Sequence, residues 1–112
     1  MARDLIAIGI DDQGQVWGGH FGIAPRYAIY DRGGTLVETR VNPYGAGQGQ
    51  KQQHHDNPQW IVDLLPECGV FIARRMGKPQ MVEALGIRAV LTAEQTPSAA
   101  LAAFLAETDN RP

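Results

Sequence analysis

Short apolar runs, separated by polar or glycine-containing turns, dominate the first half of the chain. Leu5–Ile10 is continuously apolar and ends at two aspartates, which is typical of a strand buried on both faces. Residues 26–31 and 35–41 form two further strand patterns, separated by Arg32-Gly33-Gly34. A tight turn of this kind predicts that the second and third strands pair as an antiparallel hairpin.

The second half alternates between helix starts and short apolar strands. Each predicted helix has a proline at its first position, where the missing N–H would have no partner in any case. We predict helices over 58–65, 79–85 and 97–107. Between them, buried strands are predicted over 70–73 and 88–91. The resulting element order is β-β-β-α-β-α-β-α.

This order predicts one α/β domain over residues 1–112, with a five-stranded mixed sheet and helices on both faces. The polar stretch 42–56 is expected to be a mobile loop, and 108–112 a frayed tail. If the first strand neighbours the fourth, the strand order reverses between them, and the loops 11–25 and 74–78 meet at one end of the sheet. Open α/β sheets bind ligands in a crevice at such a reversal.

Composition narrows the class of protein. The formal net charge is -2, so the chain lacks the basic surplus typical of nucleic-acid binding. No apolar run has the length of a membrane span, and Met1 to Asp4 lead into a strand pattern rather than a signal peptide. The single cysteine, Cys68, can form neither an internal disulfide nor a thiolate cage alone. We therefore expect a soluble cytoplasmic protein that binds neither nucleic acid nor membrane.

The glycine-rich run at 18–22 is the most distinctive local motif. Its glycines let the backbone come close to a ligand, and it also offers an imidazole, an aromatic face and backbone N–H groups. We interpret Gly19, His20, Phe21 and Gly22 as cofactor-binding residues. The alternative interpretation is a structural turn with a packed phenylalanine.

The histidines of the chain are His20, His54 and His55, and the predicted topology puts all of them at the same end of the sheet. Imidazole is a common metal ligand in proteins. We interpret these histidines as metal ligands. Adjacent histidines in a polar loop can equally be solvated without any ligand.

A basic run lies between the fourth strand and the next helix: Arg74-Arg75-Met76-Gly77-Lys78. Its cations, and the free N–H groups of a helix start, favour an anion. The run lacks the pattern of a nucleotide-binding P-loop. We interpret all of its residues as cofactor-binding. The alternative interpretation is a solvated basic turn in which Met76 fills a gap in the packing.

Asp11 and Asp12 end the first strand. Paired carboxylates in this position can hold a divalent metal for phosphoryl chemistry, but no further acids are predicted to converge on them. Capping of a turn is the favoured interpretation. Of the tryptophans, Trp17 is expected to wall the crevice and Trp60 to belong to the core.

Several motifs together point to a known family. They are Ile6-Ala7-Ile8-Gly9-Ile10-Asp11-Asp12, His20-Phe21-Gly22, Ala24-Pro25-Arg26-Tyr27, Asn42, a histidine-bearing loop, Ile61 to Leu65, Gly69-Val70, Met76-Gly77 and Leu85-Gly86-Ile87. With these motifs, about residues 5–106 resemble the dinitrogenase iron–molybdenum cofactor biosynthesis family, the group related to NifX, NafY and the C-terminal domain of NifB.

The resemblance implies a ribonuclease H-like α/β sheet without nuclease activity. It also implies binding of an anionic metal–sulfur cluster that is carried to, or assembled for, another protein. His20 matches the family's loop histidine, His54 or His55 matches the histidine of a later loop, and Gly77 matches the glycine after the fourth strand. The basic run is similar to small stand-alone members, including the orange protein, which holds a molybdenum–copper sulfide cluster.

We therefore predict a non-catalytic carrier for an iron–molybdenum-cofactor-like or molybdenum–copper sulfide cluster. Its partner is a cluster donor or recipient protein, and its assembly is a monomer or weak dimer. Two alternatives stay open. One is a metal-dependent nuclease or phosphohydrolase that uses Asp11 and Asp12, and the other is a regulatory interaction module that binds no cluster.

Overall fold

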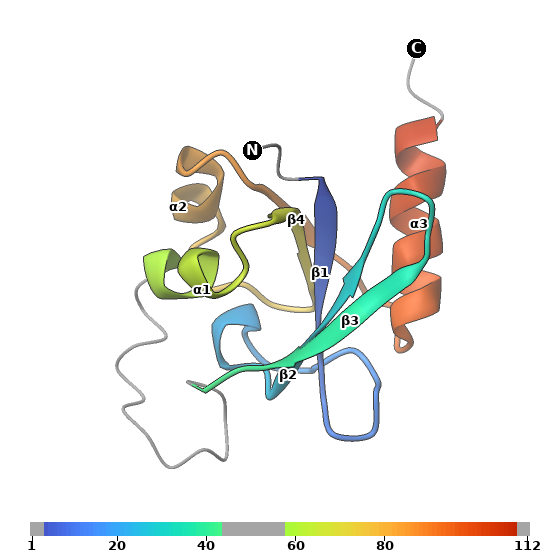
Figure 1. The fold of residues 1–112 in the computed structure, drawn as a ribbon, viewed down its shortest axis with the longest axis horizontal. Coiled ribbons are helices and arrows are strands. Elements are labelled where there is room, and N and C mark those ends of the chain that lie inside the picture. The colour runs from blue at the N-terminus through green and yellow to red at the C-terminus, as the bar shows by residue number, and fades with distance from the viewer. Residues whose placement is uncertain (1–3, 44–57, 110–112) are drawn as a thin grey trace.

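A computed structural model describes residues 4–43 and 58–109, which fold into one sheet flanked by helices (Figure 1). The strands are β1 (Leu5–Ile10), β2 (Arg26–Tyr30), β3 (Leu36–Val41), β4 (Cys68–Ala73) and β5 (Arg88–Leu91). The helices are the 3-10 helix η1 (Phe21–Ile23), α1 (Pro58–Leu64), α2 (Pro79–Ala84) and α3 (Pro97–Asp109). These bounds lie within about two residues of the predicted ones at nearly every end.

The sheet has five strands in the order β3-β2-β1-β4-β5. β2 is antiparallel to both β1 and β3, whereas β1, β4 and β5 run parallel. The predicted α/β fold with a five-stranded mixed sheet is therefore confirmed. Since β1 lies beside β4, the strand order reverses between them, as the prediction for a ligand site required.

Two boundaries differ from the prediction by two residues. α3 ends at Asp109 rather than at 107, so it includes the first residues of the predicted tail. β4 begins at Cys68 rather than at residue 70, and Cys68 pairs with Leu5 of β1. The glycine that follows Cys68 interrupts the apolar run in the sequence, so periodicity alone did not include it. Cys68 is fully buried at the amino end of β4, the end of the sheet opposite to the candidate site.

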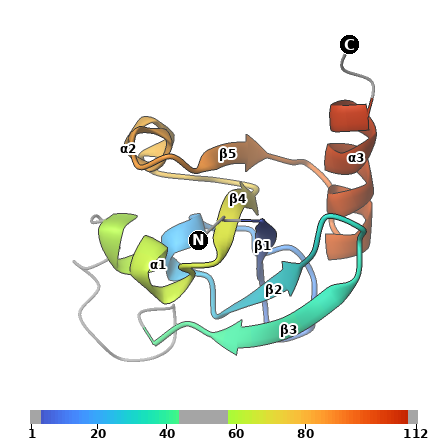
Figure 2. The same ribbon diagram turned by 45° about the horizontal axis from the view of Figure 1, so that its top comes forward.

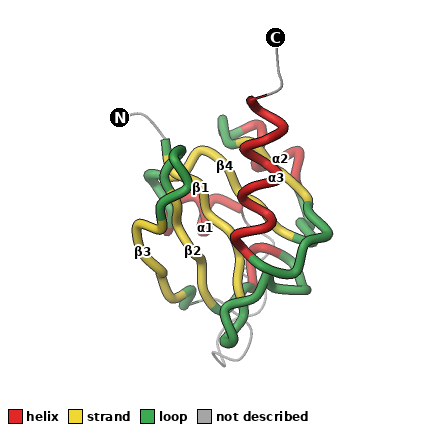
Figure 3. Tube along the Cα trace, turned by 90° about the vertical axis from the view of Figure 1, so that its right-hand side faces the viewer, coloured by secondary structure: helices red, strands yellow, loops and turns green. Residues whose placement is uncertain are grey.

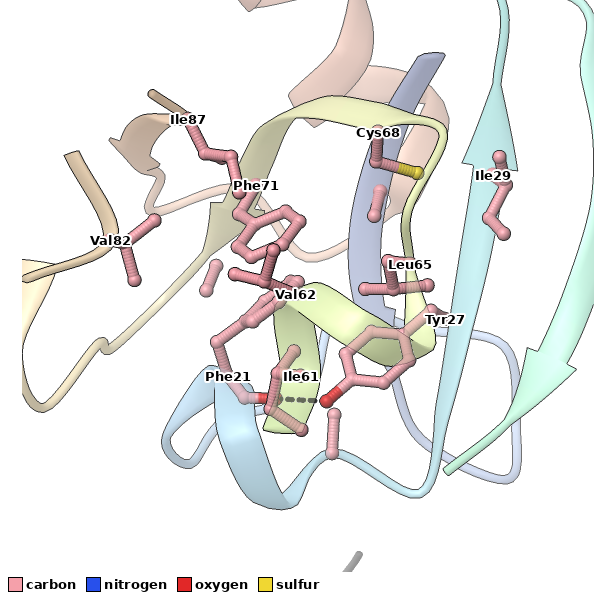
Figure 4. Close-up of a cluster of buried hydrophobic side chains, with 13 residues drawn as sticks. Phe21, Tyr27, Ile29, Ile61, Val62, Leu65, Cys68, Phe71, Val82 and Ile87 are labelled. Atoms are coloured by element: carbon pink, nitrogen blue, oxygen red, sulfur yellow. Dashed lines mark hydrogen bonds between the residues drawn. The ribbon is translucent and has the colours of Figure 1, made fainter. Parts of the chain in front are cut away.

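Alternating side chains of the sheet build two separate cores. On one face, Ala7, Phe71 and Tyr27 pack with buried residues of α1 and with Val82 of α2 (Figure 4). α3 covers the other face of the sheet (Figures 2 and 3). There Ile6 and Ile8 pack with buried residues of α3. β1 thus supplies apolar side chains to both faces, which explains its continuous apolar run.

Candidate functional site

The loop after β1 crosses to the end of β4 and pairs with the basic run. His20 and Arg75 form an isolated parallel bridge, and the backbone N–H of Phe21 donates to the carbonyl of Arg75 at 2.9 Å. Residues far apart in the sequence thus lie side by side at the carboxyl ends of the parallel strands. We call His20, Arg74, Arg75, Gly77 and Lys78 the strand-end site.

The His20 side chain lies against Gly77. A Cβ atom on Gly77 would lie 3.5 Å from Nδ1 and 3.7 Å from Cε1 of His20, which is ordinary van der Waals contact. His20 is exposed. A side chain longer than alanine at Gly77 would compete with the imidazole for this space.

Phe21 anchors the loop instead of presenting an aromatic face. Its ring is 3% exposed and stacks on Phe71 with centroids 4.6 Å apart. It also contacts the ring of Tyr27, at a centroid distance of 4.8 Å (Figure 4). The packed phenylalanine of the alternative interpretation is therefore present, but in the same loop as an exposed histidine. Phe21 contributes to the site through its backbone N–H, which holds the loop against Arg75.

Asn42, directly after β3, anchors the same loop through hydrogen bonds. It is fully buried, and its side-chain N–H groups donate to the carbonyls of Gly22 at 3.0 Å and Ala24 at 2.9 Å. They also donate to the hydroxyl of Tyr27 at 3.0 Å, and that hydroxyl donates to the carbonyl of Phe21 at 2.6 Å. Burial raises the pKa of Tyr27 well above its ordinary value, so the hydroxyl keeps its proton.

These two positioning residues were not assigned a role from the sequence. Asn42 looks there like the first residue of a polar loop, and Tyr27 like an ordinary strand residue. The only local signal is an amide directly after a strand, which is too common to be specific. Their function depends on the loop that folds over them, and that contact spans 20 residues of sequence between Asn42 and Gly22.

Arg74 and Arg75 make no ion pair with any residue in the described ranges. Arg74 is partly buried, and its Nε is a buried donor with no acceptor, whereas Arg75 is exposed. Lys78 is exposed at the start of α2. Because α2 has only six residues, attraction for an anion at this site comes mainly from the side-chain cations rather than from the helix.

The remaining residues of the two motifs have structural positions. Met76 is partly buried and packs against the core on the α1 and α2 face, in agreement with the gap-filler interpretation. Gly19 lies under the indole of Trp17, and a Cβ atom there would be 2.7 Å from Nε1 of that ring. Trp17 packs on the same core, and its buried Nε1 has no hydrogen-bond partner within residues 4–43 and 58–109.

Trp60 differs from its prediction. It is only partly buried and belongs to neither core, because Ile61, Val62 and Leu65 form the inward face of this segment. His54 and His55 lie outside the described residues, and so does the stretch 44–57 that contains most of the predicted loop.

The aspartates at the end of β1 build a turn. The carboxylate of Asp11 accepts the backbone N–H groups of Gln13 and Gln15, both at 2.9 Å. Asp12 lies 3.7 Å from Arg26 in an exposed ion pair. Among residues 4–43 and 58–109, no three histidine, cysteine or acidic side chains gather in a way that could hold a metal ion. The turn-capping interpretation thus accounts for Asp11.

The class of protein follows from this fold together with a sequence match. Residues 4–107 match the family model "Dinitrogenase iron-molybdenum cofactor", and the chain belongs to this family. The resemblance seen in the motifs is thereby confirmed. The family connects the chain with the biosynthesis or binding of that cofactor.

Two solved structures have a similar fold. The crystal structure of PH0822 has a TM-score of 0.62 and 24% identity, over 92% of this chain and 91% of that one. The NMR structure of a candidate NifB protein from Thermotoga (TM1290), of the DUF35 family, has a TM-score of 0.62 and 22% identity, over 96% and 90%. No curated protein matches the chain. Within the described residues, none of the helices has the length and apolar character that a bilayer crossing requires.

Proposed function

We propose that the strand-end site binds an anionic metal–sulfur cluster as cargo, and that the protein is a non-catalytic carrier for it. The observation that supports this most directly is the bridge between His20 and Arg75. It sets the exposed residue His20 beside Arg75, and neither Arg74 nor Arg75 has an acidic partner in the described ranges. Arginine N–H groups balance negative charge and donate to acceptor atoms such as sulfide.

The residues of the strand-end site fit a cluster that is held by few protein ligands. Cys68 is buried at the far end of β4, so thiolate ligation from this chain is not available at the strand-end site. His20 is then the metal ligand among the described residues of the site, and the buried Nε of Arg74 has no acceptor among those residues. The imidazole lies against Gly77, where a side chain longer than alanine would compete with it for space. Weak ligation of this kind suits a cluster that must be passed on.

The finer features of the proposal rest on the family and the sequence. The cluster is of the iron–molybdenum-cofactor or molybdenum–copper sulfide type, and the partner is a protein that donates or receives it. His54 or His55 adds a further ligand from the stretch after β3. The sheet is used as a ribonuclease H-like scaffold without nuclease activity, in the cytoplasm.

Anaerobic titration of the apo-protein with tetrathiomolybdate, with and without copper(I), tests the proposal. We expect a chromophore that survives desalting in stoichiometric amount, measured by visible absorption and metal analysis. His20→Ala should lose it, because the ring supplies the metal ligand. Gln13→Ala, an exposed change in the same loop, should keep it.

Gly77 offers a matched pair of variants for the same assay. Gly77→Ala should keep the chromophore, since its Cβ meets His20 at 3.5 Å, an ordinary contact. Gly77→Leu should lose much of it, because the longer side chain displaces the imidazole. Equal retention in wild type, His20→Ala and Gly77→Leu would remove His20 from the site. A folded wild type that retains neither this cluster nor extracted iron–molybdenum cofactor would favour the interaction-module alternative.

A further inference from the structure

β3 is an edge strand whose side chains are almost all exposed. The sheet order leaves its outer edge without any described neighbouring strand (Figure 2). Leu36, Val37 and Val41 are 51%, 49% and 56% exposed, although the other strands bury most of their large apolar side chains. Long exposed apolar edges are usually avoided, because their free backbone groups can pair with another strand.

The two faces of β3 carry different chemistry. Glu38 and Arg40 pair with Ile29 and Tyr27, so they lie on the face covered by α1. Thr39 pairs with Ala28 of the other core, so Thr39 and, by strand alternation, Val41 lie on the face of α3. The register shifts at Val37, between the Tyr30–Leu36 and Ile29–Glu38 pairs, so the regular segment of β3 is Glu38–Val41. The only described helix on that face is α3 (Figure 3), and Thr39 and Val41 are exposed.

We propose that β3 pairs with β3 of a second copy of this chain, in an antiparallel two-fold arrangement centred on Thr39. In this register Glu38 of each copy lies opposite Arg40 of the other. Cross-strand pairs of opposite charge are favourable. The result is a continuous sheet through both copies, with the same patch used on each side.

Charge complementarity selects this register over its neighbours. Side chains opposite each other in an antiparallel pair share a face, so the two-fold axis must pass through a residue of the regular segment. An axis at Glu38 would set two carboxylates against each other, and an axis at Arg40 two guanidinium groups. Only the axis at Thr39 gives two opposite-charge pairs. β5, at the other edge, has four residues and a single charged side chain, so it offers no such match.

The arrangement keeps the strand-end sites apart. Asn42, which supports the loop of His20, is three residues from the axis, so its two copies are about 20 Å apart. Each copy therefore retains its own site, and the pairing is independent of whether the proposed cargo binds. Because one edge strand makes a small contact, association is expected to be weak.

Cysteine cross-linking of the full chain tests the register. In the proposed pair the two Thr39 residues have Cα atoms about 4.5–5.5 Å apart, within the range that a disulfide requires. The two Val41 residues, on the same face of the strand, are about 13 Å apart, which is too far. Under mild oxidation, Thr39→Cys should form a covalent dimer on a non-reducing gel at least about tenfold more efficiently than Val41→Cys. The native Cys68 is buried and does not compete.

Sedimentation of the reduced proteins supplies an independent readout. Wild type should show a concentration-dependent dimer as the concentration is raised into the millimolar range. Glu38→Lys, which sets a lysine opposite Arg40 of the second copy, should raise the dissociation constant about tenfold or more. Glu94→Lys, the same charge change at an exposed position, should not. A wild type that stays monomeric, equal cross-linking of the two cysteine variants, or equal effects of the two lysine variants would overturn the proposal.

Discussion

At the scale of single residues, the loop glycines differ sharply in what they permit. A Cβ atom on Gly19 would lie 2.7 Å from Nε1 of Trp17, which is closer than real Cβ contacts come. A Cβ atom on Gly18 would meet nothing within 4 Å. The two neighbours therefore form a natural pair of test and control positions, although the sequence alone makes them equivalent.

We expect Gly19→Ala to lower the free energy of unfolding by about 1–3 kcal/mol, because the indole must move out of its packed position. Gly18→Ala should leave stability unchanged or raise it by up to about 1 kcal/mol through the unfolded chain. Urea denaturation measures both. Tryptophan emission in a Trp60→Phe background reports the movement of Trp17. Equal stabilities of the two alanine variants would contradict the contact between Gly19 and the indole.

At the scale of elements, Arg40 ties the edge strand β3 to the turn between α1 and β4. Its guanidinium donates to both carboxylate oxygens of Glu67, at 3.0 and 2.9 Å, and to the carbonyl of Leu64 at 2.9 Å. It also pairs with Glu38 on its own strand. The bond to Leu64 satisfies a carbonyl at the end of α1, where helical partners run out.

This contact predicts a pH dependence of stability. Hydrogen bonds from Arg40 lower the pKa of Glu67 below its ordinary value of 4.5. The stabilisation is therefore fully present above that value and is lost as the pH falls through the folded-state pKa. Glu67→Gln should destabilise the protein by roughly 1 kcal/mol at neutral pH, since the pair is partly exposed.

The pH comparison uses urea denaturation at neutral and acidic pH. Between them, Glu67→Gln should lose less stability than wild type, because one carboxylate that favours the folded state is gone. Asp63→Asn, at an exposed position of α1, serves as the control and should follow wild type. An identical pH dependence of Glu67→Gln and wild type would show that Arg40 does not perturb Glu67.

At the scale of the whole molecule, the charged side chains are distributed unevenly, although the net charge is small. The formal net charge is -2, yet Arg74, Arg75 and Lys78 gather at one end of the sheet. Asp11 and Asp12 lie on the preceding loop, but Asp11 is engaged in its turn and Asp12 faces Arg26. The charged side chains of the strand-end site itself are cations, so its attraction for an anion is open to screening by salt.

We expect retention of tetrathiomolybdate to weaken as sodium chloride is raised, and to weaken less steeply in Arg75→Gln than in wild type. Arg32→Gln removes the same charge from the turn between β2 and β3, where Arg32 donates to the carbonyl of Asp4. It should keep the wild-type salt dependence. Equilibrium dialysis at several salt concentrations measures all three proteins, and a salt-independent wild type would exclude a mainly electrostatic site.

The sequence predicted most of the fold because its signals are local. The apolar run of β1, the turn at Gly33 and the prolines that begin α1, α2 and α3 each determine structure within a few residues. The alternation of strands and helices then restricts the topology, since crossovers are right-handed and short. The placement of His20 and the basic run at one end of the sheet follows from that topology alone.

Only the tertiary structure decided how those residues are held. Periodicity cannot reveal that Phe21 turns its ring into the core, that Asn42 supports its loop, or that Gly77 rather than a neighbour lies under His20. Each of these contacts joins segments that are distant in sequence, and its geometry depends on packing between them. For the same reason, the exposure of β3 became visible only when the sheet order left it at an edge. Local physical chemistry thus determined the elements, and long-range packing determined the site and the surface.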